Sequence, residues 1–201
     1  LNLCNKNMVK MDTNNDSKAK NDLLAEVCLA ALHEGASITR YHPQHKGTNP
    51  HSKICTELAR SFADIGDIVR GRDLYLGNKK KSENKREKEK LEENFKKYFQ
   101  QIHDDVTKGG TNGAEERYKE DPDNNYSKLR EDWWNANRAK VWEALTCSKE
   151  LDNSSYFHAT CGGSESPSQA QNQCRCKNKT GASDNVNIVP TYFDYVPQFL
   201  R

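Results

Sequence analysis

Apolar residues recur at helical spacing over most of the chain, so the pattern predicts an all-α fold. A first helix is predicted over about residues 18–35, where an apolar stripe begins at Leu23 and Gly35 marks the end. A second helix is predicted over about 52–70, because its apolar residues are spaced by four, four, three and four positions. These residues are Ile54, Leu58, Phe62, Ile65 and Val69.

A third helix, over about 82–107, begins as almost pure charge and becomes amphipathic only from Leu91 onward, so its first half is expected to lie in water. A short charged helix is predicted between a glycine-rich loop at 109–113 and the turn-forming residues 121–125. The helix predicted over about 127–147 is the most aromatic and is expected at the centre of the core. Its large apolar residues are Leu129, Trp133, Trp134, Val141, Trp142 and Leu145.

Residues 148–189 are rich in Ser, Gly, Asn and Gln and show no sustained period, which predicts a long irregular loop. A last short helix is predicted to begin at Pro190, because the fixed φ of proline suits a first helical position, while Pro197 limits its length. Five of its residues are expected to face inward: Tyr192, Phe193, Val196, Phe199 and Leu200.

The composition leaves only a small apolar core for one or two domains. Of 201 residues, 34% are hydrophobic and 30% are charged, and 31 Lys and Arg nearly balance 29 Asp and Glu. No apolar run approaches the ~18 residues of a membrane span, so any membrane attachment is expected outside this chain. The chain begins at Leu1 without a basic and apolar leader, and we expect it to be a piece of a longer protein.

Seven cysteines can supply the stability that the small core lacks, since disulfides are typical of proteins from oxidising compartments. The odd count leaves one thiol free or bonded to a partner outside the chain. The alternative is a reduced, intracellular zinc protein, with ligands at His158, Cys161, Cys174 and Cys176. The single residue between the last two cysteines argues against it, because structural zinc sites use gaps of roughly two to four residues.

No enzyme and no cofactor are predicted. Residues 66–73 approach a phosphate-binding loop, but Arg72 and Asp73 stand where that loop needs Lys and a hydroxyl residue. The segment also ends an amphipathic helix and follows no strand. Carboxylates are scattered over charged helix faces, and no Ser/His/Asp arrangement can be proposed from their order.

A basic run over residues 79–90 carries the best-supported binding chemistry, because seven basic and three acidic side chains give it a surplus of positive charge. It could bind a sulfated or phosphorylated polyanion. The alternative is an exposed helix face, solubilised by Glu and Lys at i,i+4 spacing. Nucleic acid is not predicted as a partner, since the run lacks interleaved aromatic residues.

Three segments carry a resemblance to a known family: ARSFADIGDIVRGRDLY at 59–75, LREDWW at 129–134 and PTYFDYVPQFLR at 190–201. In this order they closely resemble the Duffy-binding-like domain, alpha class, of the variant erythrocyte membrane adhesins of malaria parasites. The resemblance runs from Leu3 to the last residue. It implies an all-α, disulfide-linked helical bundle with long irregular loops and no catalytic activity.

The resemblance also implies a division of the chain and a role. Residues 1–19 resemble the end of a first subdomain, 20–189 a second subdomain, and 190–201 the first helix of a third. Such domains bind host erythrocyte or endothelial receptors and glycans, including heparan sulfate, and so produce cytoadherence and rosetting. They act on the extracellular face of the infected red cell, show antigenic variation and meet host antibodies. The alternative is an architectural segment, with the ligand site in parts of the domain outside this chain.

Pairing and site residues follow from the same resemblance. It implies that Cys28 bonds to Cys147, that Cys55 bonds to Cys174 or Cys176 with Cys161 taking the other, and that Cys4 has its partner outside the chain. The implied glycan contacts are Lys79, Lys80, Lys81, Lys85, Arg86, Lys88 and Lys90. The helix over 52–70 is expected to be structural, with Phe62, Ile65 and Val69 packing against Trp133 or Trp134 and Val141, and with Gly66 allowing close approach.

Overall fold

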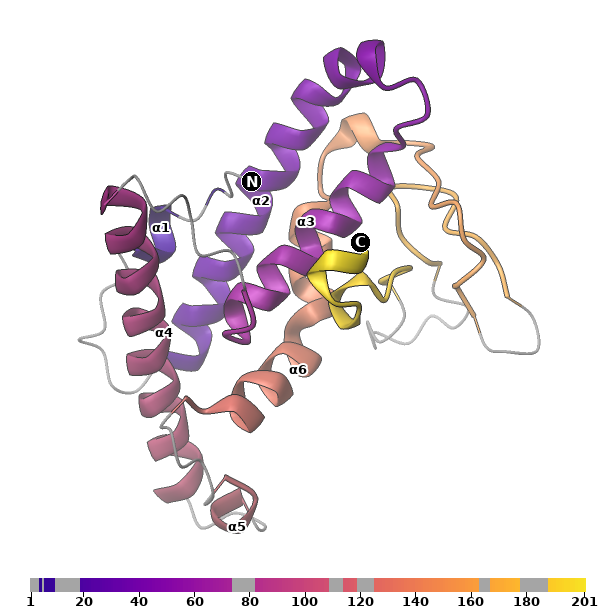
Figure 1. Ribbon diagram of the computed structural model, residues 1–201. Coiled ribbons are helices and arrows are strands. Elements are labelled where there is room, and N and C mark those ends of the chain that lie inside the picture. Colours follow the sequence, from indigo (N-terminus) through magenta and orange to yellow (C-terminus); the bar gives the residue numbers. More distant parts are fainter. Residues whose placement is uncertain are drawn as a thin grey trace.

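Helices form most of the described chain, as the periodicity predicts (Figure 1). The structure is a computed structural model that describes residues 4, 6–9, 19–73, 82–108, 114–118, 125–162, 167–177 and 188–201. The α-helices are α1 (Lys6–Val9), α2 (Ala19–Thr48), α3 (Ile54–Val69), α4 (Ser82–Lys108), α5 (Ala114–Tyr118) and α6 (Ser127–Leu145). Three short 3-10 turns follow, η1 (Lys149–Leu151), η2 (Phe193–Tyr195) and η3 (Gln198–Leu200). Within the described ranges no extended strand forms, and the all-α prediction is confirmed.

The prediction that the first helix ends at Gly35 is wrong, because α2 continues to Thr48. Gly35 is buried inside α2, and a Cβ built on it would lie 1.9 Å from the backbone oxygen of Leu145 at the end of α6. The glycine therefore permits two backbones to touch where α2 and α6 cross. The pattern at this position reflects a helix contact and does not mark a helix end.

The core forms where α2, α3 and α6 pack against one another. The Phe62 ring lies 5.1 Å from the rings of both Trp134 and Trp142, and all three side chains are fully buried. A Cβ on Gly66 would lie 2.8 Å from the Trp134 indole, so this glycine lets the ring lie directly on α3. The predicted close approach at Gly66 therefore involves Trp134, the second of the two neighbouring tryptophans.

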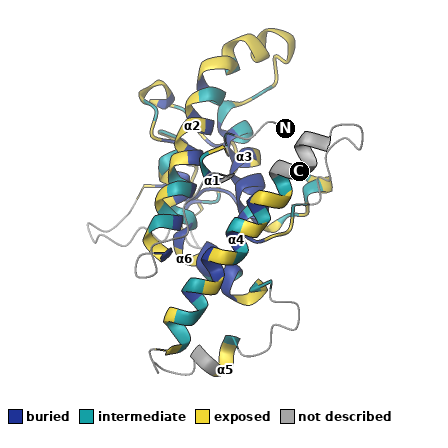
Figure 2. Cartoon of the chain, turned by 90° about the vertical axis from the view of Figure 1, so that its left-hand side faces the viewer, coloured by how far each residue is buried: buried dark blue, intermediate teal, exposed yellow. Residues whose placement is uncertain are grey.

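The helix α4 packs against α1, α2 and α6. Figure 2 shows buried and exposed residues along its length. Burial begins at Leu91, as the sequence pattern predicts, and Phe99 meets Trp133 edge to face at 6.1 Å. Glu89 and Lys90 are exposed. The side chains of 82–87 lie outside the described residues, so the prediction for the first half of this helix stays a prediction there.

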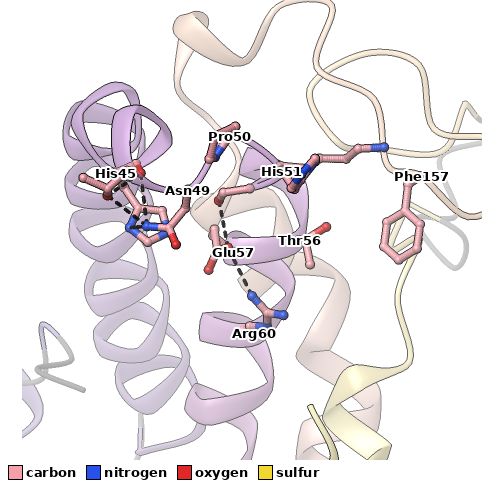
Figure 3. Close-up of a pocket in the computed structure, with 11 residues that line it drawn as sticks. His45, Asn49, Pro50, His51, Thr56, Glu57, Arg60 and Phe157 are labelled. Atoms are coloured by element: carbon pink, nitrogen blue, oxygen red, sulfur yellow. Dashed lines mark hydrogen bonds and ion pairs between the residues drawn. The ribbon is translucent and has the colours of Figure 1, made fainter.

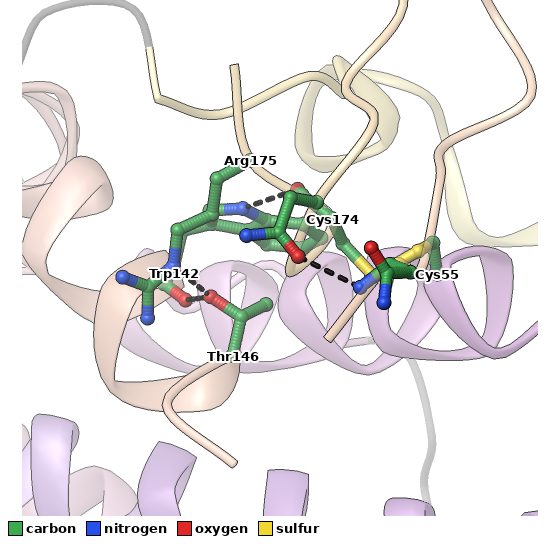
Figure 4. Close-up of a disulfide and its surroundings, with 7 residues drawn as sticks. Cys55, Trp142, Thr146, Cys174 and Arg175 are labelled. Carbon is green, nitrogen blue, oxygen red and sulfur yellow. Dashed lines mark hydrogen bonds between the residues drawn. A yellow bond between two sulfur atoms is a disulfide. The ribbon is translucent and has the colours of Figure 1, made fainter. Parts of the chain in front are cut away.

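Two disulfides fix the irregular segment that follows α6. Cys55 in the first turn of α3 is bonded to Cys174 (Figure 4). Cys161 is bonded to Cys176, so the pairing is one of the two that the resemblance left open. The Trp142 indole donates a hydrogen bond to the Cys174 carbonyl at 3.1 Å. The segment thus lies over the end of the core although it has almost no secondary structure of its own.

The structure differs from the prediction at Cys28 and Cys147, which are free cysteines. Cys28 is half-buried within α2, whereas Cys147 is exposed and lies beyond Leu145, the last residue of α6. The two thiols thus lie in different surroundings and are not joined.

The C-terminal segment also departs from its prediction, because η2 and η3 replace a helix beginning at Pro190. Tyr192, Phe199 and Leu200 were expected to face inward but are 61%, 79% and 67% exposed. After Pro190 the buried residues of this segment are polar, namely Thr191 at 1% and Asp194 at 2% exposure. The segment is held by the polar contacts described next, so apolar periodicity could not identify its buried side.

Candidate binding surface

The three segments that carry the family resemblance meet in one buried polar network. Asp194 of η2 accepts two hydrogen bonds from the Arg138 guanidinium of α6, both at 2.8 Å, and one from the Trp134 indole at 2.9 Å. Arg70, at the end of α3, donates to Asp67 at 3.2 Å and to the backbone oxygen of Asp194. Each buried charge thus has a partner of opposite sign, which burial demands.

The last residue continues this network into α3. Arg201 donates to Asp64 at 3.0 Å and also bonds to Asp67. Burial nevertheless raises the pKa of Asp64 to about 6, against the lowering effect of Arg201, and burial also raises the pKa of Asp67. This network joins α3, α6 and the C-terminal segment, and it explains the motif residues as structural partners of one another.

A second buried arginine, Arg130 of α6, bonds to the C-terminal end of α3. The Arg130 side chain is 1% exposed and donates from Nε to the Val69 backbone oxygen at 2.6 Å and from Nη2 to that of Ile68 at 3.2 Å. It also forms a two-point ion pair with Glu92 of α4 at 2.6 and 3.0 Å. Because Arg130 satisfies carbonyl groups at the C-terminal end of α3, the segment LREDWW acts as a helix cap. The expectation that the motif helix is structural agrees with this geometry.

The predicted glycan contacts are only partly described. Lys79, Lys80 and Lys81 lie outside the described residues, and Lys85 and Arg86 lie in α4 with side chains that are not described. Lys88 bonds to the Asp73 carboxylate at 3.3 Å, and Lys90 is exposed. Residues 82–90 of the basic run therefore form the start of α4, and the role of the run as a site stays a prediction.

The alternative zinc site does not form. Three of its four expected ligands, Cys161, Cys174 and Cys176, are joined in disulfides and so cannot act as thiolate ligands. Among the described residues no other group of three or more His, Cys, Asp or Glu side chains could hold a metal ion. No helix in the described part of the chain is long and apolar enough to cross a membrane.

A groove at the corner between α2 and α3 is a concave surface that the sequence did not predict (Figure 3). This α2–α3 groove has a volume of about 580 Å³ and is lined by 11 residues. They are His45, Thr48, Asn49, Pro50, His51, Ser52, Lys53, Thr56, Glu57, Arg60 and Phe157. Pro43, Gly47 and Pro50 are typical of turns, but α2 continues past Pro43 and includes His45.

Polar contacts fix one side of the groove. Glu57 accepts a hydrogen bond from Ser52 at 2.9 Å and forms an ion pair with Arg60 at 3.1 Å. The ammonium of Lys53 lies 5.7 Å from the centroid of the Phe157 ring, which belongs to the irregular segment. Phe157 was not a predicted site residue, because only the fold of that segment brings it beside α3.

Comparison with known proteins identifies the family. The family model described as the Duffy binding domain matches residues 1–201. The chain belongs to the Duffy binding domain family. A search of the curated proteins finds no match.

Solved structures agree with this assignment. The NTS-DBL1(alpha-1) domain of PfEMP1 from the varO strain of Plasmodium falciparum is 37% identical with a TM-score of 0.68, and the match covers 98% of this chain and 39% of that one. The NTS-DBL1-alpha and CIDR-gamma double domain of the same strain is also 37% identical, with a TM-score of 0.67 over 98% of this chain and 25% of that one. The PfEMP1 IT4var13 DBLbeta domain, solved bound to ICAM-1, is 28% identical with a TM-score of 0.60, over 98% and 40%. This Duffy binding domain chain thus spans about two fifths of the length of the single-domain relatives, and its resemblance to the alpha class is confirmed.

Proposed function

We propose that this chain is a non-enzymatic, extracellular adhesion module that binds receptors or glycans on host erythrocytes or endothelial cells. The observation that carries the proposal is the Duffy binding domain match over the whole chain, since a related domain of this family was solved bound to the host protein ICAM-1. We place the module on the outer face of the infected red cell, held by a membrane segment outside this chain. Cytoadherence and rosetting are the activities that it would serve, and its exposed surface would meet host antibodies.

The scaffold supports this role because it holds a surface in place without relying on a large core. The disulfide between Cys55 and Cys174 joins positions 119 residues apart, and the Asp194 network ties the C-terminal segment to α3 and α6. A surface that is rigid before binding loses less conformational entropy on association. The irregular segment can then vary in sequence while the helices keep their arrangement.

Receptor binding is tested with the oxidised chain and an array of host ectodomains that includes ICAM-1, together with intact erythrocytes. The proposal predicts saturable binding to at least one receptor or to the cells. If a longer domain containing this sequence binds while the chain alone does not, the ligand site lies outside the chain, which is the architectural alternative.

The basic run over 79–90 is the proposed glycan contact. Its support is the surplus of seven basic over three acidic side chains, together with the exposure of Lys90 at the start of the amphipathic part of α4. Sulfate groups are bound by clustered cations, and the attraction weakens as salt screens it. A sulfated glycosaminoglycan such as heparan sulfate is the partner that this chemistry favours.

Charge reversal tests the glycan contact. Changing Lys79, Lys80, Lys81, Lys85 and Arg86 to Glu is expected to abolish retention of the folded chain on heparin at physiological salt. The matched control reverses five exposed lysines elsewhere, namely Lys20, Lys97, Lys128, Lys140 and Lys149. Equal losses in both variants would show that heparin responds to net charge alone, and unchanged retention in the first would exclude the basic run.

A further inference from the structure

We propose that the α2–α3 groove binds an acidic segment of a host protein, with a carboxylate held by Lys53 beside the ring of Phe157. The inference rests on the proposed adhesive function, to which it assigns a contact and a class of partner. It concerns a different surface from the basic run over 79–90, which is the proposed glycan contact.

The groove has the size and rigidity of a preformed site. Its volume of about 580 Å³ falls within the range of roughly 300–1,000 Å³ that is typical of ligand pockets. Its walls come from the end of α2, the turn at 49–53, the first two turns of α3 and the irregular segment at Phe157 (Figure 3). The disulfide from Cys55 to Cys174 joins α3 to the irregular segment, so the two walls are covalently linked.

The charges in the groove favour an anion. Glu57 is the one acidic residue among the 11 that line it, and its carboxylate is already engaged by Ser52 and Arg60. Lys53 is exposed, and within the described ranges no carboxylate lies at ion-pair distance from it. Lys53 therefore leaves one positive charge without an acidic partner, beside an aromatic face. The α3 helix begins at the next residue and adds its partial positive charge at this end.

A short acidic peptide matches these groups better than a sulfated polymer does. One lysine can hold one carboxylate, whereas a polyanion is bound by several clustered cations. Phe157 is 39% exposed and offers an apolar surface to the stem of the acidic residue or to a neighbouring apolar side chain. Thr56 and Asn49 line the same groove and can form hydrogen bonds with a peptide backbone.

The test measures fluorescence anisotropy of a labelled ten-residue peptide that alternates Glu and Leu, titrated with the oxidised chain, with a Lys and Leu peptide as comparison. We expect the acidic peptide alone to bind, and Lys53→Glu to weaken it by about tenfold or more, because like charges repel in a contact. Phe157→Ala is expected to weaken the same peptide. The matched control is Lys46→Glu, which makes the same charge change on an exposed residue of α2 outside the groove and should change binding by less than about twofold.

Several results would overturn the inference. They are equal effects of Lys53→Glu and Lys46→Glu, no preference for the acidic over the basic peptide, or stronger Lys53-dependent binding of sialyllactose or a heparin fragment than of the acidic peptide. Erythrocyte binding separates this inference from the proposed function. Cell binding that is lost in Lys53→Glu supports the groove as the contact, whereas cell binding that is unchanged overturns the groove and leaves the adhesive function standing. Absence of cell binding by the unaltered chain counts against the adhesive function, while the peptide titration still decides the groove.

Discussion

Replacing Gly35 with alanine tests the crossing of α2 and α6. Alanine favours helix over glycine by about 1 kcal/mol, so propensity alone predicts that Gly35→Ala stabilises α2. The structure predicts the opposite, because the added methyl would lie 1.9 Å from the Leu145 backbone oxygen and 2.8 Å from its carbonyl carbon. Both are backbone atoms of the neighbouring element and cannot move aside by a change of rotamer.

The two effects can be compared in magnitude. Overpacking costs typically about 1–3 kcal/mol, and a clash with backbone belongs at the upper end, so the net loss after the gain in propensity is about 2 kcal/mol. For a chain of this length, that corresponds to a fall in Tm of about 4–8 °C. Urea unfolding followed by fluorescence of the buried tryptophans, with the disulfides intact, measures the free energy of unfolding directly.

Gly47 provides the matched control inside the same helix. A Cβ there would meet no atom within 4 Å, and the residue is exposed. We therefore expect Gly47→Ala to raise the free energy of unfolding by at most about 1 kcal/mol. If Gly35→Ala leaves the free energy of unfolding unchanged, or raises it as Gly47→Ala does, the close contact of the two helices is refuted.

Three further predictions concern the disulfides and the buried charges. Changing Cys55 and Cys174 to serine should lower the free energy of unfolding by about 4–5 kcal/mol, and removing the Cys161–Cys176 bridge should lower it by about 3 kcal/mol. The longer loop costs more because opening it gives the unfolded chain more conformational entropy. Equal losses in urea unfolding would contradict this ranking. Asp194→Ala should cost about 3–5 kcal/mol and expose 188–201 to protease, since it leaves the Arg138 charge buried without its carboxylate, and a loss below about 1 kcal/mol would refute the network. The pKa of Asp64 rises from 3.8 to about 6 on folding, so the folded chain binds more protons in this interval, and the free energy of unfolding should fall as the pH rises through it. Asp64→Asn should reduce that fall, whereas an unchanged pH slope would exclude this carboxyl as its source.

The helices could be predicted from the sequence because their apolar faces are regular. Apolar spacing located α3, α4 and α6 to within a few residues of their observed ends. The same reasoning failed at Gly35, since a glycine that ends a helix and a glycine that admits a neighbouring backbone leave the same local signal. The difference depends on Leu145, more than a hundred residues away.

The candidate site was harder to predict, because its residues come together only in the folded chain. Lys53 and Phe157 are separated by more than a hundred residues and belong to no recognisable spacing, and the groove depends on how the irregular segment lies on α3. The C-terminal segment shows the same limit. Its fold is fixed by Asp194 bonding to α6, and apolar periodicity carries no information about such a polar contact.

The central claim is that the cross-linked helical scaffold presents an adhesive surface to host cells. Flow cytometry of erythrocytes titrated with the labelled chain, before and after reduction of its disulfides, tests this claim most directly. The account predicts saturable binding by the oxidised chain and loss of that binding once the chain is reduced. Binding that fails to saturate, or that persists unchanged in the fully reduced chain, would contradict it.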